Sequence, residues 1–149
     1  MALTMTQLRS LLDVDEPNYS TLAGLLSRDD IPNLEKLVQG NDAMLASKAA
    51  YAITLIDDAA AVRALDVAVS SPRDTVRVAS AAGLRNLSGF DVTAVAERLL
   101  SDSDVGVRKS AIKSAQALGI DALRPKLEAL ANTDPEPGIR ALAKEALRR

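Results

Sequence analysis

The sequence predicts an all-α protein, an α-solenoid of about four two-helix repeats that follow an N-terminal helical cap. The first reason is a repeat: the pair Val107-Arg108 recurs as Val76-Arg77, 31 residues upstream, and as Ile139-Arg140, 32 residues downstream. The second is that small and apolar residues follow each pair at intervals of four, four and three, the buried stripe of an amphipathic helix. The third is composition: with two Tyr, one Phe and no Trp, the core must be aliphatic, which favours closely packed helices over sheets.

The recurring pair opens the second helix of each repeat. Its buried positions are expected to align across the repeats as three columns: Ala49, Ser80, Ala111 and Ala143; Ile53, Leu84, Ala115 and Leu147; and Ile56, Leu87 and Leu118. The expected N-caps are Asp42, Asp74, Ser103 and Asp134, the last followed by Pro135 at the first helical position. The expected C-terminal stops are Gly89 and Gly119.

A shorter first helix is expected before each second helix. Its apolar positions are Leu34, Leu37 and Val38; Leu65, Ala68 and Val69; Ala96, Leu99 and Leu100; and Leu127, Leu130 and Ala131. The expected caps are Asp30, Asp57 or Asp58, Asp91 and Asp121. The array therefore spans residues 30–149 as one structural domain, with repeats at about 30–58, 59–90, 91–120 and 121–149.

Residues 1–29 do not fit the period. Thr4 to Gln7 has the spacing of a capping box, and Leu8, Leu11 and Leu12 form an apolar stripe behind it. After a break at residues 13–17, a second short helix is expected, with apolar positions at Tyr19, Leu22, Leu25 and Leu26. Because a solenoid needs its first apolar face covered, we interpret residues 1–29 as an N-terminal cap.

The turn into the second helix carries the pattern Asp-x-x-x-x-Val-Arg. It is complete at 102–108 and, with Ile for Val, at 134–140; residues 71–77 lack the aspartate and residues 40–46 lack both ends. A two-helix repeat of this length with this pattern resembles HEAT repeats, most of all the short bacterial HEAT-like repeats of phycobilisome lyase subunits. The resemblance implies a right-handed solenoid and says little about function, since such repeats serve many unrelated partners.

The arginine of this pattern needs a structural explanation, because a cation in the first turn of a helix opposes the macrodipole. Asp102 and Asp134 are expected to compensate by pairing with Arg108 and Arg140, or with the arginine of a neighbouring repeat such as Arg77. The resemblance implies a ladder of this kind between repeats. If the pairs are exposed, each contributes only about 0.2–1 kcal/mol and mainly sets repeat orientation.

No catalytic, metal-binding or cofactor-binding residues are expected. The chain has no Cys and no His, which removes the usual nucleophile, general base and metal ligands. Ser110 and Lys113 match Ser-x-x-Lys but lack the companion motifs of the serine enzymes that use it. The acidic runs lack the EF-hand pattern, and no Gly-rich phosphate loop is present. The sequence thus indicates a protein that is not an enzyme.

A binding surface is therefore the expected functional feature, and the resemblance to HEAT repeats implies that the second helices line the concave side that would carry it. The outward positions taken as partner-binding candidates are Ser47, Tyr51, Thr54, Val78, Arg85, Lys109, Lys113 and Gln116. Tyrosine is enriched among binding hot spots, so Tyr51 is the first candidate for an anchor. The alternative that its ring packs against the cap remains equally open.

Charge keeps two function classes open. Residues 1–75 hold 6 basic and 11 acidic residues, whereas residues 76–149 hold 12 and 9, and the net charge is −2. The leading hypothesis is a protein-interaction scaffold, expected to be cytoplasmic and monomeric, with no membrane segment and another protein or peptide as partner. The alternative is a nucleic-acid-backbone binder that uses the basic C-terminal half, which the net negative charge disfavours. A weaker alternative, implied only by the resemblance, is a lyase-type chromophore chaperone.

Overall fold

The computed structural model describes residues 2–148, and the described chain is all-helical. Its α-helices are α1 (Met5–Leu12), α2 (Tyr19–Leu25), α3 (Ile31–Val38), α4 (Ala43–Ile53), α5 (Ala59–Val69), α6 (Asp74–Gly83), α7 (Thr93–Leu100), α8 (Val105–Leu118), α9 (Arg124–Thr133) and α10 (Pro137–Leu147). Three short 3-10 helices add η1 (Arg28–Asp30), η2 (Leu84–Leu87) and η3 (Asp121–Leu123). None of the described helices is long and apolar enough to cross a membrane.

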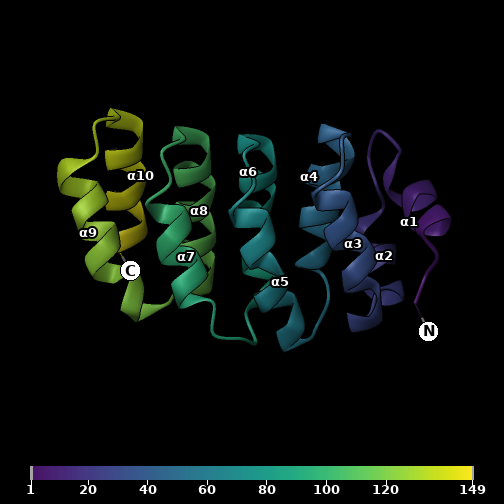
Figure 1. The fold of residues 1–149 in the computed structure, drawn as a ribbon. Helices are drawn as coiled ribbons and strands as arrows, with labels where there is room; N and C mark the ends of the chain where they lie inside the picture. Colours follow the sequence, from purple (N-terminus) through teal and green to yellow (C-terminus); the bar gives the residue numbers. More distant parts are fainter. Residues whose placement is uncertain (1, 149) are drawn as a thin grey trace.

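The helices form a row of antiparallel pairs with the two termini at opposite ends (Figure 1). We call α3, α5, α7 and α9 the first-helix layer, and α4, α6 with η2, α8 and α10 the second-helix layer. Second helices pack against one another much more extensively than first helices do. This difference is what the inner layer of a curved stack requires, and the architecture is the α-solenoid that the sequence predicts.

The core between the layers is aliphatic, as the composition predicts. The column Ala49, Ser80, Ala111 and Ala143 is fully buried, and Ile53, Leu84 and Ala115 are buried beside it. Only the last members of the expected columns, Leu118 and Leu147, are half-buried. Small side chains in this column let neighbouring second helices approach closely, which explains why alanine dominates it.

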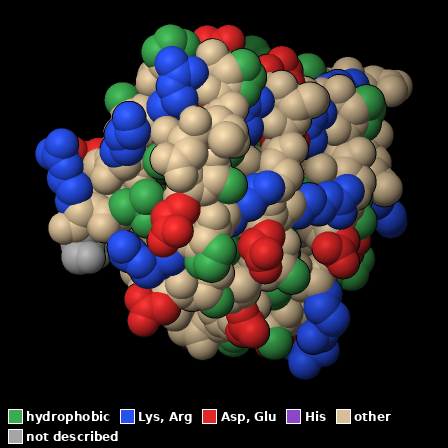
Figure 2. All heavy atoms as spheres, turned by 90° about the vertical axis from the view of Figure 1, so that its left-hand side faces the viewer, with side chains coloured by type: hydrophobic (Ala, Val, Ile, Leu, Met, Phe, Trp, Pro, Cys, Tyr) green, Lys and Arg blue, Asp and Glu red, His purple; other side chains and the backbone are tan. Residues whose placement is uncertain are grey.

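The end formed by α9 and α10 has a polar outer surface. Ala50, Ala81 and Ile112 are buried at equivalent positions in α4, α6 and α8, where each faces the next repeat. The fourth member of this column is Lys144, which is exposed. Figure 2 faces this end and shows Lys, Arg, Asp and Glu side chains interspersed with small apolar ones. Such a surface suits a terminal helix pair in contact with water.

The N-terminal pair covers the opposite end of the array. Thr4 and Gln7 form the expected capping box, and Leu8, Leu12 and Leu22 are buried beneath the pair. Asp30 is fully buried and accepts hydrogen bonds from Leu3 N at 2.6 Å and from Ser27 N at 2.9 Å, so one carboxylate fixes both ends of the cap. The expected apolar stripe of α2 is wrong at Leu25, which is 50% exposed because α2 ends there.

Several helix ends match the expectation. Asp42 and Asp58 cap α4 and α5 by accepting from Leu45 N and Ala60 N. Gly119 ends α8 in the left-handed conformation, at φ 62°. Gly89 is not a left-handed stop, because the helix tightens into η2 and ends at Leu87.

Other expected caps are displaced by one or two residues. The N-caps of α6, α8 and α10 are Arg73, Asp104 and Glu136, not Asp74, Ser103 and Asp134, and Pro137 rather than Pro135 begins α10. Likewise Asp91 accepts from Thr93 N although Val92 is the N-cap of α7, and Asp121 begins η3 without capping it.

A side-chain turn explains why α8 and α10 begin later than expected. Asp102 and Asp134 accept from the backbone N–H two residues ahead, at 2.9 Å each, and Ser71 does the same for Arg73 at 3.2 Å. These turns lengthen the loops before α8 and α10, whereas α6 begins one residue earlier than expected, with Arg73 as its N-cap.

Candidate interaction surface

Two arginines of the second-helix layer cross the junctions between repeats. Arg77 makes a bidentate contact with Asp102, and Arg108 makes one with Asp134; in each, Nε lies 2.9 Å from Oδ2. The remaining nitrogen, Nη1, donates to a carbonyl of the arginine's own repeat: Ser71 O for Arg77, and both Asp102 O and Ser103 O for Arg108. Of the two pairings left open by the sequence, the structure therefore has the one between neighbouring repeats.

The C-terminal junction is the more buried of the two. The side chains of Arg108 and Asp134 are 11% and 3% exposed, against 16% and 12% for Arg77 and Asp102. The contribution of about 0.2–1 kcal/mol that is typical of an exposed ion pair thus does not apply to Arg108. Removal of one partner would leave a buried charge without its counter-charge, which costs several times more than loss of a surface pair.

Arg140 stands at the same position of the last pair. Its Nη1 donates to Asp134 O at 2.6 Å, which is the same contact with its own repeat's turn that Arg77 and Arg108 make. Within residues 2–148 no carboxylate forms an ion pair with Arg140. At the two junctions that have the ion pair, the aspartate that pairs with the arginine comes from the following repeat.

The first junction uses a different arginine. Ala46 occupies the usual arginine position and Ser71 the usual aspartate position. Arg73, at the N-cap of α6, reaches back across the junction and donates to Gly40 O at 2.7 Å and Asn41 O at 3.3 Å. Gly40 O is the carbonyl six residues before position 46, equivalent to the carbonyl bound by Arg77 and Arg108. Sequence reasoning missed Arg73, and the usable signal was an arginine two residues after Ser71, at the junction where both ladder residues are absent.

The second-helix layer concentrates positive charge. It holds eight basic residues and two acidic ones, in a chain of net charge −2: Lys48, Arg77, Arg85, Arg108, Lys109, Lys113, Arg140 and Lys144 against Asp74 and Glu145. The first-helix layer is nearly balanced, with Lys36, Arg63, Arg98, Arg124 and Lys126 against Glu35, Asp66, Glu97 and Glu128. The charge difference therefore follows the layers and not only the two halves of the chain.

We use the term second-helix face for the solvent-facing side chains of this layer. Ser47 and Lys109 each line a shallow hollow on it, Val78 is half-buried between α6 and α8, and Lys113 and Arg85 are exposed. Gln116 is half-buried near the end of α8, in a separate hollow lined also by Arg124 and Leu127 of α9. Six of the eight candidates thus belong to this face, with Tyr51 at its N-terminal end.

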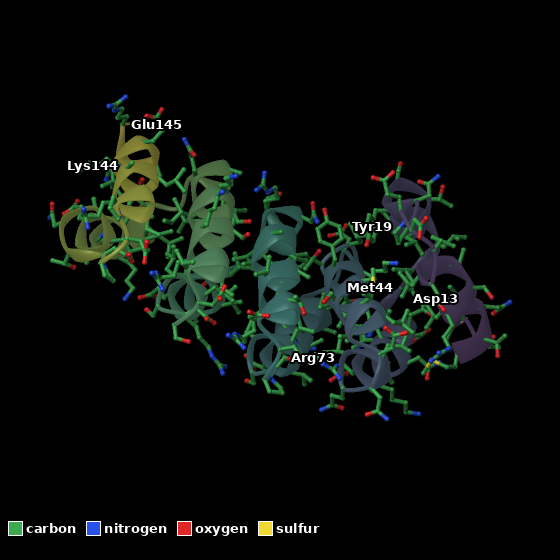
Figure 3. The ribbon with its side chains drawn as sticks, turned by 90° about the horizontal axis from the view of Figure 1, so that it is seen from above. Asp13, Tyr19, Met44, Arg73, Lys144 and Glu145 are labelled. Carbon is green, nitrogen blue, oxygen red and sulfur yellow. The ribbon has the colours of Figure 1, made fainter. Side chains whose placement is uncertain are left out.

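Tyr51 packs against the cap. Its ring and that of Tyr19 lie 4.7 Å apart between centroids at an angle of 58°, and both residues are half-buried. Partial burial raises the pKa of the Tyr19 phenol above its ordinary value, and the adjacent Tyr51 phenol raises it further. Figure 3 shows Tyr19 and Met44 near the N-terminal end of the row, with Lys144 and Glu145 at the other end. Tyr51 therefore joins the cap to α4 while part of it stays accessible.

Thr54 does not belong to the surface, and its assignment as an outward position was wrong. It is 1% exposed; its Oγ1 donates to Tyr51 O at 2.5 Å and accepts from Asn86 Nδ2 at 3.2 Å. A Cβ on Gly83 would stand only 2.3 Å from Thr54 Oγ1. The helix at this point tightens and turns Thr54 toward α6, so the residue binds the next repeat instead of facing solvent.

Side chains that could hold a metal ion do not gather on this face. Within residues 2–148 no three or more Asp, Glu, His or Cys side chains come together as a possible metal site. The acidic residues instead lie mostly in turns, where Asp42, Asp58, Asp102, Asp104 and Asp134 accept backbone N–H groups. Helix capping and turn formation account for these five carboxylates.

Comparison with known proteins identifies the repeats. Residues 64–148, more than half of the chain, match the family of HEAT repeats. No curated protein matches the sequence. The match covers the two junctions that have the arginine–aspartate ladder, and the helix pairs upstream of it have the same stacked arrangement. The chain belongs to the HEAT-repeat family.

Proposed function

We propose that this protein is a non-catalytic scaffold that binds another protein or peptide on its second-helix face. HEAT-repeat proteins are typically non-catalytic and generally mediate protein–protein interaction. We choose this face because of its charge. The second-helix layer has eight basic and two acidic residues, although the net charge of the whole chain is negative.

Part of this charge is available to a partner. Three of the eight basic residues make the contacts of the ladder position and Lys48 donates to Val14 O in the cap, which leaves Arg85, Lys109, Lys113 and Lys144. Apolar side chains accompany them: Met44 is 69% exposed and Val105 45% exposed, both in first turns of second helices. Basic groups steer an acidic partner and apolar groups hold it, and a rigid stack presents both without a large ordering cost.

The test is capture of the natural partner with matched charge reversals. The variant Lys109→Glu/Lys113→Glu changes two exposed residues of α8, whereas Lys36→Glu/Arg63→Glu changes two exposed residues of the first-helix layer by the same charge. We expect the first variant to lose capture in a cell extract of the source organism and the second to retain it, with both keeping the wild-type helical circular-dichroism signal. Equal loss from both variants, or crosslinks confined to the first-helix layer, would reject this face.

Nucleic-acid binding is the second candidate, favoured by the same charge. Phosphate tracking needs several convergent Lys and Arg, and the second-helix face supplies five outside the ladder. This function predicts that binding of a labelled oligonucleotide weakens steeply as salt rises. Failure to bind single- or double-stranded DNA or RNA at low salt would remove it.

The third candidate function is a chromophore chaperone, which is suggested only by the resemblance of the repeats to those of phycobilisome lyase subunits. It requires a pocket for a large planar pigment. The two hollows on the second-helix face measure about 250 and 350 Å³, at or below the low end of ordinary small-molecule sites, and two larger hollows of about 560 and 520 Å³ at the turns between repeats have no aromatic lining residue to stack on a planar pigment. Addition of an open-chain tetrapyrrole without a change in its absorption spectrum would remove this candidate.

A further inference from the structure

The second-helix face carries two hollows at equivalent places in the repeat. The α4–α6 hollow is lined by Ala43, Met44, Ser47, Lys48 and Thr75, and the α8–α10 hollow by Val105, Lys109, Glu136, Gly138, Ile139 and Leu142. Val105 and Lys109 occupy in α8 the positions that Ala43 and Ser47 occupy in α4, and Gly138 corresponds to Thr75. The two hollows are therefore copies of one feature, two repeats apart.

The equivalent space between α6 and α8 differs from these two hollows. Gly106 lies there, and a Cβ placed on it would be 3.0 Å from Asp104 Oδ2 and 3.7 Å from Val78 Cγ2. Val78 thus places an apolar side chain on the surface between the two hollows, while a separate and more polar hollow lies beside it, lined among others by Arg73, Asp74 and Asp104. A ligand that crosses from one hollow to the other would pass over Val78.

Basic side chains accompany both hollows. Lys48 lines the first, and its position is fixed by a hydrogen bond from Nζ to Val14 O in the cap. Lys109 lines the second, and Lys113 is exposed one turn further along α8. Glu136 is the one acidic lining residue of either hollow, and Lys109 lies on the same rim. Asp74 is exposed between the hollows, so the preference for an acidic ligand rests on Lys109, Lys113 and the excess of basic over acidic residues in the second-helix layer.

On the basis of the function proposed above, we propose that the partner contributes an extended acidic segment. This segment places one apolar side chain in each of the two hollows. Packed helices lie about 8–10 Å apart, so two repeats separate the hollows by about 20 Å. An extended chain advances about 3.3 Å per residue, which places the two apolar side chains about six residues apart and, at an even spacing, on the same side of the chain. Acidic side chains between them face Lys109 and Lys113.

The first arm of the test uses synthetic peptides and the whole protein. One labelled peptide has two leucines at the predicted spacing, with glutamates at the intervening positions on the same side; a second has the same composition with the leucines half as far apart. Fluorescence anisotropy is expected to show binding of the first and an affinity about tenfold lower for the second. Equal affinities would overturn the two-hollow arrangement.

The second arm uses matched protein variants. Met44→Asp and Val105→Asp each place a carboxylate in one hollow, in the first turn of a helix where a negative charge suits the macrodipole. Ala94→Asp makes the same change in the first turn of α7, in the first-helix layer. We expect each hollow variant to lose about tenfold in affinity for the first peptide, and Ala94→Asp to bind like the wild type.

The outcomes separate this inference from the proposed function. If the first peptide does not bind, or if Ala94→Asp also loses binding, the proposed segment with two apolar anchors is overturned. The scaffold function is tested separately, by capture of the natural partner with the Lys109→Glu/Lys113→Glu variant. Competition by oligothymidylate as effective as that by the unlabelled peptide also overturns it, because the face then binds polyanions regardless of apolar anchors.

Discussion

The first and last junctions of the array hold neighbouring repeats together by different chemistry. At the last junction a buried guanidinium pairs with a buried carboxylate, Arg108 with Asp134, and both also bind the backbone. At the first junction Arg73 donates to two neutral carbonyls and Thr54 packs against Gly83. The last junction thus depends on balanced charge, whereas the first depends on close approach of the backbone. The two should therefore fail under different substitutions.

The largest effect is expected at the last junction. Asp134→Ala leaves the Arg108 guanidinium buried without its counter-charge and also removes the acceptor of Glu136 N. We expect a loss of about 3–5 kcal/mol in the free energy of unfolding, measured by urea denaturation. Asp121→Ala, which removes an exposed carboxylate that caps no helix, is the control and should change stability little. A loss at Asp134 no greater than that of the control would show that the pair is not effectively buried.

The next effect is expected at the first junction. Gly83→Ala places a Cβ 2.3 Å from Thr54 Oγ1 and 2.7 Å from Thr54 Cγ2, so α4 and α6 must separate. We expect this overpacking to cost about 1–3 kcal/mol, read from the melting temperature. Adding Thr54→Ala removes two of the close contacts, so the double variant should lose less than the sum of the single changes. Strict additivity would place the strain elsewhere.

A smaller effect is expected for Arg73→Ala. The side chain is half-buried and donates to Gly40 O and Asn41 O, which become accessible to water when it is removed. Because neither carbonyl carries a charge and both are rehydrated, the cost should be about 1 kcal/mol, well below that of Asp134→Ala. Equal costs for the two substitutions, measured under the same conditions, would erase the distinction between the junctions.

The sequence predicts the fold well and the junctions only in part. The Val-Arg repeat and its apolar columns are enough for the stacked helix pairs, because periodic burial is a local signal. The partner of Arg108 was left open because the sequence does not show whether the aspartate of its own repeat or that of the next repeat lies closer to it. That distance depends on how the repeats stack. The N-caps of α8 and α10 were displaced since Asp102 and Asp134 each use one oxygen for an Asx turn, which depends on backbone conformation. Thr54 was misplaced because a helix that tightens at its end rotates its last residues away from the regular face.

The candidate surface follows the same rule. Lys109 and Lys113 are exposed on α8, as helical periodicity predicts, and their role in binding stays a prediction. Met44, Val105 and the two hollows were missed because the first turn of a helix faces solvent or core according to where the helix begins. The uneven charge of the two layers indicates a binding face more clearly than the uneven charge of the two halves of the chain. Charges can be summed over the layers only when the helix boundaries are known.

The smallest net effect is expected when the first junction is rebuilt to match the last. Ala46→Arg alone places an unpaired cation at a buried position, and Ser71→Asp alone adds a carboxylate near the turn, so each single change should destabilise. Together, in an Arg73→Ala background, the new arginine has Gly40 O and the introduced carboxylate within the geometry that Arg108 uses. We expect the combined variant to unfold within about 1 kcal/mol of the wild type, with a favourable coupling energy in the double-mutant cycle. Zero coupling would mean that the backbone at the first junction is too different to accept the pair, and that the close approach of Gly83 to Thr54 fixes its geometry.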